Sequence, residues 1–267
     1  MNSAMHQRLR GAGLGPAVPR RNGGPRPAPW AWVLCLATGI AAAADTPAAT
    51  LEPFVAHYSV HLDGRERGRS TLSLERGTGD TWRYTLRAEG TRGLARLAGF
   101  EAEQTSVFVL EGGAPRLQRS LSTREALVGG REVETVFDWV LGEARWHGDV
   151  DADRRGPVAL TSNAVNAHLL NLALALDVHG HAPGDVVRYR LIERGRADAV
   201  AYTIGPAERL PTPLGELHAI PLTSEQPEKS RVTTAWYAPG LPPTPVRVLR
   251  TRDGKPEYEL RLLSIEP

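Results

Sequence analysis

The sequence has few of the residue types that build covalent or metal chemistry. Cysteine occurs once, at Cys35, and methionine occurs twice among 267 residues. A single thiol forms no intramolecular disulfide and supplies no cysteine-based metal site. No G-x-S-x-G motif is present, and none of the histidines lies in a recognisable triad motif. We therefore predict no catalytic residue, no metal and no cofactor, and the balance is against an enzyme without excluding one.

Long apolar runs are also missing. The segment Trp30–Ile40 is apolar but falls short of the roughly 20 residues that a membrane-spanning helix needs. No later segment is longer and equally apolar. The sequence predicts no membrane span once the amino-terminal segment has been removed.

Residues 1–44 have the composition of an export signal. They contain five arginines and no acidic residue, followed by the short apolar run and the triplet Ala42-Ala43-Ala44. We predict that residues 1–44 are a signal peptide, with cleavage between Ala44 and Asp45. The remaining chain is then expected to be soluble, periplasmic and free of thiols.

Two other export routes are open but less well supported. Arg20-Arg21 is a twin-arginine pair, although the residues that follow it fit that signal poorly. Cys35 suggests a lipid-anchored protein, but Leu34 is larger than the residue that normally precedes a lipoprotein cysteine. The site after Ala44 fits cleavage better.

The positive net charge of the full chain comes from residues 1–44. The full sequence has 32 basic and 30 acidic residues, a net charge of +2. Five of the basic residues and none of the acidic ones lie in residues 1–44, which leaves 27 against 30, a net charge of −3. The remaining arginines are spread beside acids rather than gathered in one stripe. This pattern argues against nucleic acid as a partner.

Apolar and polar residues alternate along most of the chain, beginning with Phe54–Leu62. This period of two is typical of half-buried strands. In the first strand we expect Phe54, Ala56, Tyr58, Val60 and Leu62 to face the core. The residues expected to face water are His57, Ser59, His61 and Asp63. Predicted strands cover residues 53–63, 68–76, 80–90, 100–111, 115–125, 131–140, 143–148, 185–193, 198–205, 215–224, 231–238, 245–252 and 256–265.

A helical period replaces the alternation at about 161–178. Val165, Leu169, Leu172 and Leu176 fall on one helical stripe, and Thr161 or Ser162 is placed to cap it. We predict an all-β fold, mainly antiparallel, in which a curved sheet or incomplete β-barrel is covered by this one α-helix. Residues 45–267 are expected to form a single domain, because no low-complexity linker interrupts them.

Three groups of polar residues are weak candidates for chemistry. They are a histidine and aspartate group after the helix (Asp177, His179, His181 and Asp185), an alternating aspartate group (Asp149, Asp151 and Asp153) and the strand pair Glu101 and Glu103. A metal site, a calcium loop and an acid/base pair are the corresponding hypotheses. Solvated loops and solvated strand acids explain all three more simply.

Aromatic residues in the predicted strands give the better functional indication. Curved sheets commonly enclose apolar ligands with such side chains, although aromatic residues also dominate ordinary cores. The candidate ligand-binding residues are Trp82, Tyr84, Trp139, Trp236 and Tyr258.

Several local motifs together resemble the DUF3108 family of exported bacterial proteins. The motifs are Pro53-Phe54-x-Ala56-x-Tyr58 with Gly64 and Gly68, Phe137-Asp138-Trp139, Glu208–Gly215, and Trp236-Tyr237-Ala238-Pro239 with Pro245-Val246. The resemblance spans about residues 51–265. It implies a periplasmic β-rich protein with a curved or barrel-like sheet, and it supplies no catalytic residue. Thr161–Val165 departs from the aspartate and leucine-serine pair that often open the helix in relatives.

The leading hypothesis is a soluble periplasmic protein without enzymatic activity that binds an apolar or amphipathic envelope component, such as a lipid or a glycan-linked molecule. This hypothesis rests on the combination of a predicted export signal, a β-strand pattern and aromatic residues in the strands. One alternative is a hydrolase of envelope polymers with a spatially assembled His and Asp/Glu site. The other alternative is a structural or assembly partner, which would present sheet edges or a broad apolar patch.

Overall fold

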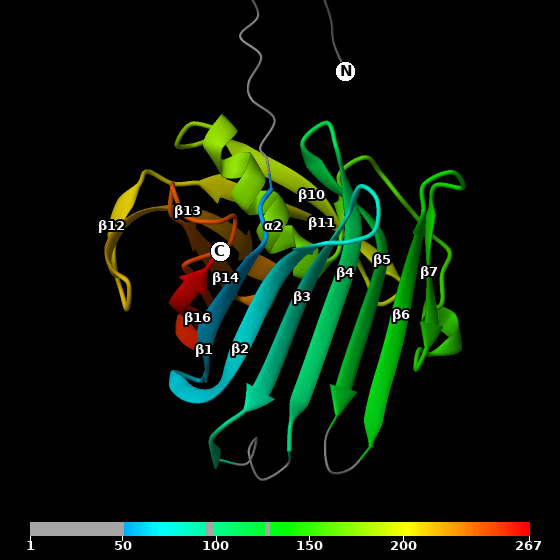
Figure 1. The fold of residues 1–267 in the computed structure, drawn as a ribbon, viewed down its shortest axis with the longest axis horizontal. Coiled ribbons are helices and arrows are strands. Elements are labelled where there is room, and N and C mark those ends of the chain that lie inside the picture. Colours follow the sequence, from blue (N-terminus) through cyan, green and yellow to red (C-terminus); the bar gives the residue numbers. More distant parts are fainter. Residues whose placement is uncertain (1–50, 94–98, 126–128) are drawn as a thin grey trace, which may run out of the picture. The chain divides into compact units, whose positions relative to one another are not determined.

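One antiparallel sheet curls around one α-helix in the part of the chain that the structure describes (Figure 1). The computed structural model describes residues 51–93, 99–125 and 129–267. The predicted signal peptide 1–44, its cleavage site and Cys35 lie outside these residues.

The strands follow one another closely in sequence, and short turns connect most of them. Their bounds are β1 Phe54–Leu62, β2 Arg65–Arg76, β3 Thr81–Gly90, β4 Glu101–Glu111, β5 Ala114–Glu125, β6 Gly130–Asp138, β7 Glu143–Gly148, β8 Val158–Ala159, β9 Ala164–Val165, β10 Val186–Glu193, β11 Arg196–Ile204, β12 Glu208–Thr212, β13 Gly215–Gln226, β14 Arg231–Tyr237, β15 Arg247–Arg252 and β16 Lys255–Glu266. Helix α2 is Ala167–Asp177, and single 3-10 turns are η1 Ala152–Arg154, η2 Val178–Gly180 and η3 Pro227–Lys229.

The sheet consists of two meanders that meet in its middle. Its order is β8-β7-β6-β5-β4-β3-β2-β1-β16-β15-β14-β13-β11-β10-β9, with β12 attached to β13 outside this path. All pairs are antiparallel except β9 with β10, which helix α2 connects as a crossover. The end strands β8 and β9 are not paired with each other, so the described sheet is not closed. This architecture confirms the predicted curved sheet with one covering helix.

The helix begins later than its sequence pattern predicts. Residues 161–165 form a turn and β9, because Ala164 and Val165 pair with β10. The cap is Asn166, whose side chain accepts a hydrogen bond from the backbone N–H of Leu169 at 2.8 Å. Such a cap stabilises a helix by about 1 kcal/mol. The predicted caps Thr161 and Ser162 are therefore wrong.

The core lies between the inner face of the sheet, defined as the face toward α2, and the helix. Phe54, Ala56 and Tyr58 of β1 are buried as predicted. Leu62 is wrong in the predicted set, since it is 42% exposed, and Ser59 is buried although it was expected to face water. The register of β1 shifts between His57 and Tyr58 against β16, and again after Val60 against β2. These bulges break the strict alternation along β1.

A short hairpin occupies the proline-containing segment before β13. Strand β12 pairs with the first half of β13, from Glu208 opposite Ala219 to Thr212 opposite Gly215. The prolines of this segment are compatible with an edge strand, because β12 has no second partner in the described sheet. Strand β12 also contacts β16, so the hairpin folds back over the last strands.

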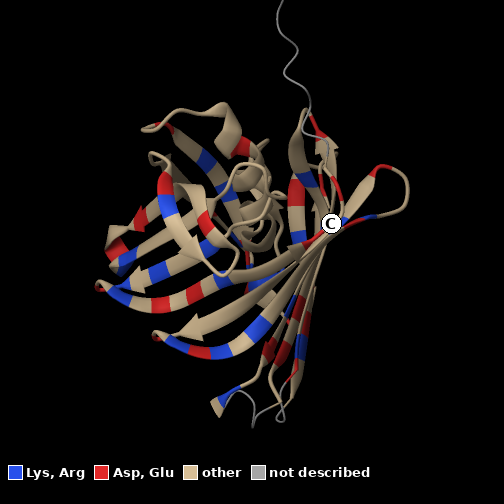
Figure 2. Cartoon of the chain, turned by 60° about the vertical axis from the view of Figure 1, so that its left-hand side comes forward, with Lys and Arg blue, Asp and Glu red and all other residues tan. Residues whose placement is uncertain are grey.

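Charged residues of both signs alternate along the strands of the sheet (Figure 2). Basic and acidic positions lie side by side rather than in a single-sign patch. Among the residues that the structure describes, no helix combines the length and the apolar composition of a membrane span.

Candidate functional site

The five aromatic residues predicted to bind a ligand occupy separate places. Trp82 and Tyr84 of β3 are buried in the core, where the Tyr84 ring stacks on His168 of α2 with 4.7 Å between ring centroids. Tyr258 of β16 packs against the same core, and burial raises its pKa to about 12. These three side chains act as packing residues in the described structure.

The other two predicted residues are held by polar contacts. The Trp139 indole N–H donates to the backbone oxygen of Leu117 at 2.7 Å. Trp236 of β14 donates its indole N–H to the Glu208 carboxylate at 2.5 Å, and the Arg247 guanidinium lies 5.0 Å from its ring centroid. Among the five predicted residues, Trp236 is the one that contacts a residue lining a groove, namely Arg247.

That groove lies where the β12–β13 hairpin folds over β15 and β16, and we call it the hairpin groove. It has a volume of about 430 Å³, within the 300–1,000 Å³ typical of ligand pockets. Its lining residues are Leu210, Pro211, Thr212, Pro213, Val246, Arg247, Arg261 and Leu262. Most of the lining is apolar, and both charged residues are arginines.

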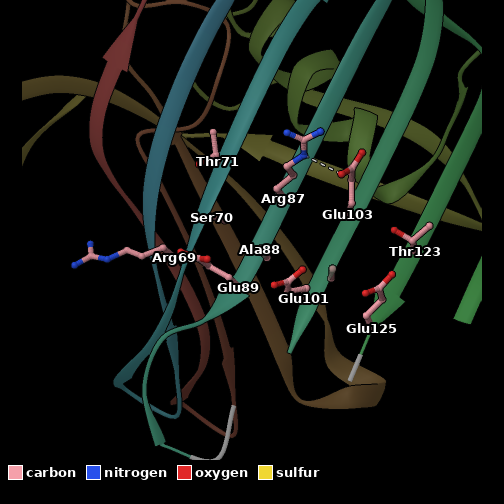
Figure 3. Close-up of a pocket in the computed structure, with 11 residues that line it drawn as sticks. Arg69, Ser70, Thr71, Arg87, Ala88, Glu89, Glu101, Glu103, Thr123 and Glu125 are labelled. Carbon is pink, nitrogen blue, oxygen red and sulfur yellow. Dashed lines mark hydrogen bonds and ion pairs between the residues drawn. The ribbon is translucent and has the colours of Figure 1, made fainter. Parts of the chain in front are cut away.

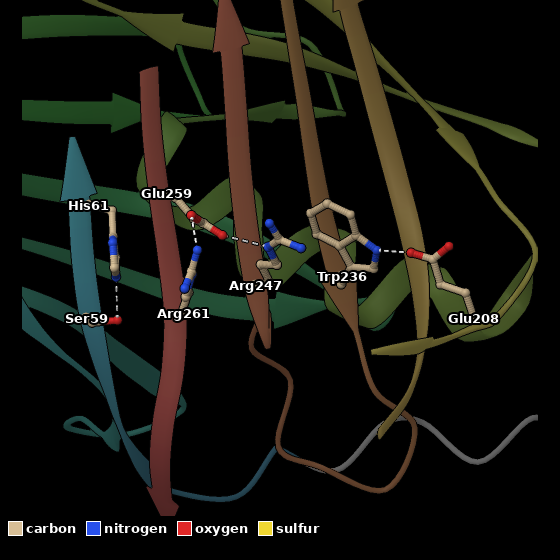
Figure 4. Close-up of polar contacts among 7 residues, drawn as sticks. All are labelled: Ser59, His61, Glu208, Trp236, Arg247, Glu259 and Arg261. Atoms are coloured by element: carbon tan, nitrogen blue, oxygen red, sulfur yellow. Dashed lines mark hydrogen bonds and ion pairs between the residues drawn. The ribbon is translucent and has the colours of Figure 1, made fainter. Parts of the chain in front are cut away.

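The two arginines are placed by the strand register. Trp236, Arg247 and Arg261 lie directly opposite one another on β14, β15 and β16, so their side chains share one face. Like charges opposite each other destabilise a sheet, and Glu259 offsets this cost. Its carboxylate accepts from Arg247 Nε at 2.8 Å and from Arg261 Nη2 at 2.9 Å (Figure 4).

Two guanidinium groups share this one carboxylate. Glu259 is 4% exposed. Burial raises its pKa, but the hydrogen bonds and charges of Arg261 and Arg247 outweigh burial and hold the pKa below its usual value. Within the described residues, neither guanidinium makes another hydrogen bond. Counted with Glu259 alone, the two arginines keep one net positive charge and several free N–H donors beside an apolar groove; the Glu208 carboxylate nearby is held by the Trp236 indole N–H.

The sequence analysis missed Arg247, Glu259 and Arg261. Glu259 and Arg261 are two residues apart in one strand, which places them on the same face. That spacing was a usable signal for an ion pair. The contribution of Arg247 depends on pairing between β15 and β16, which the sequence pattern alone does not specify.

A buried serine and histidine pair provides the test of the hydrolase alternative. Ser106 of β4 and His168 Nδ1 are 3.0 Å apart, and both residues are buried. His168 Nε2 has no partner among the described residues, so no carboxylate orients the ring. Burial lowers the pKa of His168 to about 3, which makes it a weak base for activating a serine at neutral pH. This pair is a structural element of the core.

The polar groups considered from the sequence hold no ion site in the described residues. His181 Nδ1 lies 3.6 Å from Asp185, whereas Asp177 accepts a hydrogen bond from Tyr189 instead of facing the histidines. In the aspartate loop, the Asp149 carboxylate accepts from the backbone N–H of Glu132 at 2.8 Å. The aspartate and histidine loops are explained by local hydrogen bonds.

A shallow pocket on the strands β2–β5 contains the Glu101 and Glu103 pair (Figure 3). Glu103 pairs with Arg87 at 2.8 Å. Glu89, Glu101 and Glu125 lie opposite one another on β3, β4 and β5, and all three are exposed. Their like charges are solvated, and among the lining residues only Ser70 is a buried polar group. The hairpin groove remains the better candidate.

Comparisons with known proteins concern the fold and the family. A β-barrel-like protein of the domain of unknown function DUF1849 from Brucella abortus is 10% identical, with a TM-score of 0.48, and the match covers 81% of this chain and 98% of that one. A Bacteroides fragilis protein with a YmcC-like fold is 10% identical, with a TM-score of 0.32, and the match covers 82% and 97%. No curated protein matches the chain. The family described as "Protein of unknown function (DUF3108)" matches residues 57–261, and the chain belongs to this family.

Proposed function

We propose that this chain is a periplasmic binding protein, without enzymatic activity, whose hairpin groove takes an amphiphile with an acidic head group. The observation that carries the proposal is the pair of guanidiniums sharing one buried carboxylate at an apolar groove. A ligand carboxylate or phosphate would supply the missing negative charge. An arginine fork bound to such an anion is among the stronger polar interactions.

The apolar part of the ligand is assigned to the remaining wall of the groove. Leu210, Val246 and Leu262 are each buried, and Pro211 and Pro213 continue the apolar surface along the hairpin. Burying alkyl groups there contributes about 25 cal/mol for each Å² removed from water. An acyl chain with an acidic head therefore satisfies both parts of the lining. An acidic lipid of the bacterial envelope is the ligand class that combines these features.

The periplasmic assignment has separate support. Residues 1–44 have the arginine-rich start, short apolar run and Ala42-Ala43-Ala44 triplet of an export signal. Amino-terminal sequencing of protein recovered from a bacterial periplasm tests this assignment. The expected first residue is Asp45, and a full-length chain retained in the cytoplasm contradicts it.

The first experiment is native mass spectrometry of the chain from Asp45 onward, purified from a bacterial periplasm. A stoichiometric adduct is expected, and denaturing extraction identifies it as an acidic lipid. A glycan-linked molecule without an acidic group would overturn the assigned ligand class. Repeated preparations with a clean unliganded mass would count against the whole proposal.

A binding experiment tests the groove itself. Dodecyl phosphate, below its micelle concentration, is titrated into the protein and followed by tryptophan fluorescence. Arg261→Gln is expected to weaken binding about tenfold, the effect of roughly 1.4 kcal/mol. Arg209→Gln is the matched control, because Arg209 lies in the same hairpin, is exposed and is absent from the groove lining. Equal losses in both variants, or equal binding of uncharged dodecyl glucoside, would refute the arginine site.

A further inference from the structure

A second cavity opens on the inner face of the sheet, away from the hairpin groove. Its volume is about 250 Å³, and it is bounded by β4–β7, the residue before α2, the η1 turn and the β10–β11 turn. Strands β5 and β6 contribute inner-face pairs in register, including Ser120 opposite Thr135 and Arg124 opposite Arg131. We call it the arginine-rimmed cavity.

Close packing fixes the far wall of this cavity. Gly195, in the β10–β11 turn, lies so near the η1 turn that a Cβ at this position would be 2.5 Å from the backbone oxygen of Arg154. The turn and η1 are therefore in direct contact across the cavity mouth. Arg154 and Arg194 both belong to the lining at this contact. They come from elements other than β5 and β6, which supply Arg124 and Arg131.

Positive charge exceeds negative charge around the cavity. Its lining contains four arginines and two acids. Of the acids, Asp151 lies 3.9 Å from Arg154, and Glu193 accepts a hydrogen bond from the backbone N–H of Ala167 at 2.9 Å. Burial raises the pKa of Glu193, against the opposing effects of that hydrogen bond and Arg194. Both acids thus have local roles.

Two of the four arginines face each other without a carboxylate. Arg124 and Arg131 are directly opposite on β5 and β6, and neither forms an ion pair within the described residues. Arg131 donates through Nε to the backbone oxygen of Asp149 at 2.8 Å. Like charges opposite each other destabilise a sheet. A bound anion would remove this repulsion.

The floor of the cavity offers a buried hydroxyl donor. Ser120 is 5% exposed, and its Oγ accepts a hydrogen bond from Asn166 Nδ2 at 3.1 Å. No acceptor for the Ser120 hydroxyl proton is present among the described residues. The Asn166 carbonyl is occupied by Leu169, and its amide also donates to Ser106 at 3.2 Å. The Ser120 proton is therefore an unused donor at the cavity floor.

We propose that the arginine-rimmed cavity binds a phosphoryl group. Guanidiniums from β5, β6, η1 and the β10–β11 turn, together with the Ser120 hydroxyl, offer donors from several elements, which suits a tetrahedral oxyanion better than a planar carboxylate. The cavity is smaller than the roughly 300 Å³ at the lower end of ligand pockets, so it accommodates a compact group. This site is independent of the hairpin groove and shares no lining residue with it.

The probe is inorganic phosphate, and the assay is isothermal titration calorimetry on the chain from Asp45 onward at low ionic strength. The double variant Arg124→Gln/Arg131→Gln is expected to bind phosphate about 100-fold more weakly, at about tenfold for each lost guanidinium. Arg83→Gln/Arg188→Gln removes the same charge from exposed positions outside the cavity and is expected to change the affinity less than about twofold.

A second pair of variants separates a built site from diffuse attraction. Ser120→Ala is expected to weaken phosphate binding about fivefold, because it removes the floor donor and no charge. Ser70→Ala is its control, since Ser70 is also a buried inner-face hydroxyl but lies outside the cavity. Loss of binding in the arginine double variant with no effect of Ser120→Ala would overturn the proposed geometry. No heat with wild-type protein, or equal losses in both arginine doubles, would overturn the site.

Glycerol 3-phosphate distinguishes the source of the phosphoryl group. Tighter binding than inorganic phosphate assigns the group to a larger molecule, and weaker binding assigns it to the free ion. Sulfate and acetate serve as further probes. Acetate binding as tight as phosphate would contradict the phosphoryl assignment. Since Arg261→Gln lies outside this cavity, its effect on dodecyl phosphate tests the groove separately.

Discussion

His168 predicts a specific loss of stability in acid. Its ring is 5% exposed and lies between Ser106, which bonds Nδ1, and the stacked ring of Tyr84. Nε2 is buried without a partner, so protonation would place an uncompensated charge in the core. Burial lowers the pKa in the folded state to about 3. In the unfolded chain the same group titrates near its ordinary value of about 6.5.

The sign and size of the effect follow from proton linkage. Between these two values the unfolded chain binds one more proton at this histidine than the folded chain, so the free energy of unfolding falls as the pH falls. Each pH unit below about 6.5 removes about 1.4 kcal/mol. From neutral pH to about pH 4.5, this group removes roughly 3 kcal/mol. That is a large part of the 5–15 kcal/mol typical of a folded domain.

The assay compares urea unfolding near pH 7 and near pH 4.5, followed by tryptophan fluorescence. His168→Asn keeps a polar group near Ser106 but cannot titrate. It should therefore lose roughly 3 kcal/mol less stability between the two pH values than wild type, whatever its stability at pH 7. His218→Asn removes an exposed histidine of β13 and should behave as wild type. Equal acid losses in wild type and His168→Asn would refute the reasoning.

Two further matched pairs test turn geometry and core hydrogen bonds. Gly195 and Gly64 both have φ of 73° in two-residue hairpin turns, but of the two only Gly195 lies where an added Cβ would meet backbone atoms. Gly64→Ala is expected to lower the free energy of chemical unfolding by about 1 kcal/mol, and Gly195→Ala to lower it clearly more. Tyr58→Phe leaves Thr244 without its 2.6 Å partner and should cost about 1–3 kcal/mol. Tyr84→Phe removes a hydroxyl without a hydrogen-bond partner among the described residues and should be neutral or stabilising; equal costs would contradict the assignment.

The sequence was sufficient for the fold class because the signal is local. Alternation along Phe54–Leu62 reports the buried face of a strand directly, and Phe54, Ala56 and Tyr58 are buried as expected. Bulges are not visible in the pattern, which is why Leu62 and Ser59 were misplaced. Strands β8 and β9 have two residues each, too short for any period to identify.

The candidate site was less predictable, because its parts come together only through long-range pairing. Trp236 was selected as a strand aromatic, but Glu208, its hydrogen-bond partner, lies 28 residues earlier in another strand. Arg247 and Arg261 meet across two strands. The segment with Pro211 and Pro213 forms a hairpin with β13, and the fold of this hairpin over β16 creates the groove. Local propensity does not contain that contact.

The pairing of β1 with β16 has a consequence for how the domain folds. All other antiparallel neighbours in the sheet are close in sequence, whereas Val55 lies opposite Glu266. Until β16 has paired with it, β1 has an open edge that another chain could occupy. Closing this pair last gives the domain a slow, non-local folding step. The pairing also brings the start of β1 close to the end of β16. A short linker joining these two ends, with the chain opened at Gly112-Gly113, would give a circular permutant in which β1 and β16 pair through local contacts.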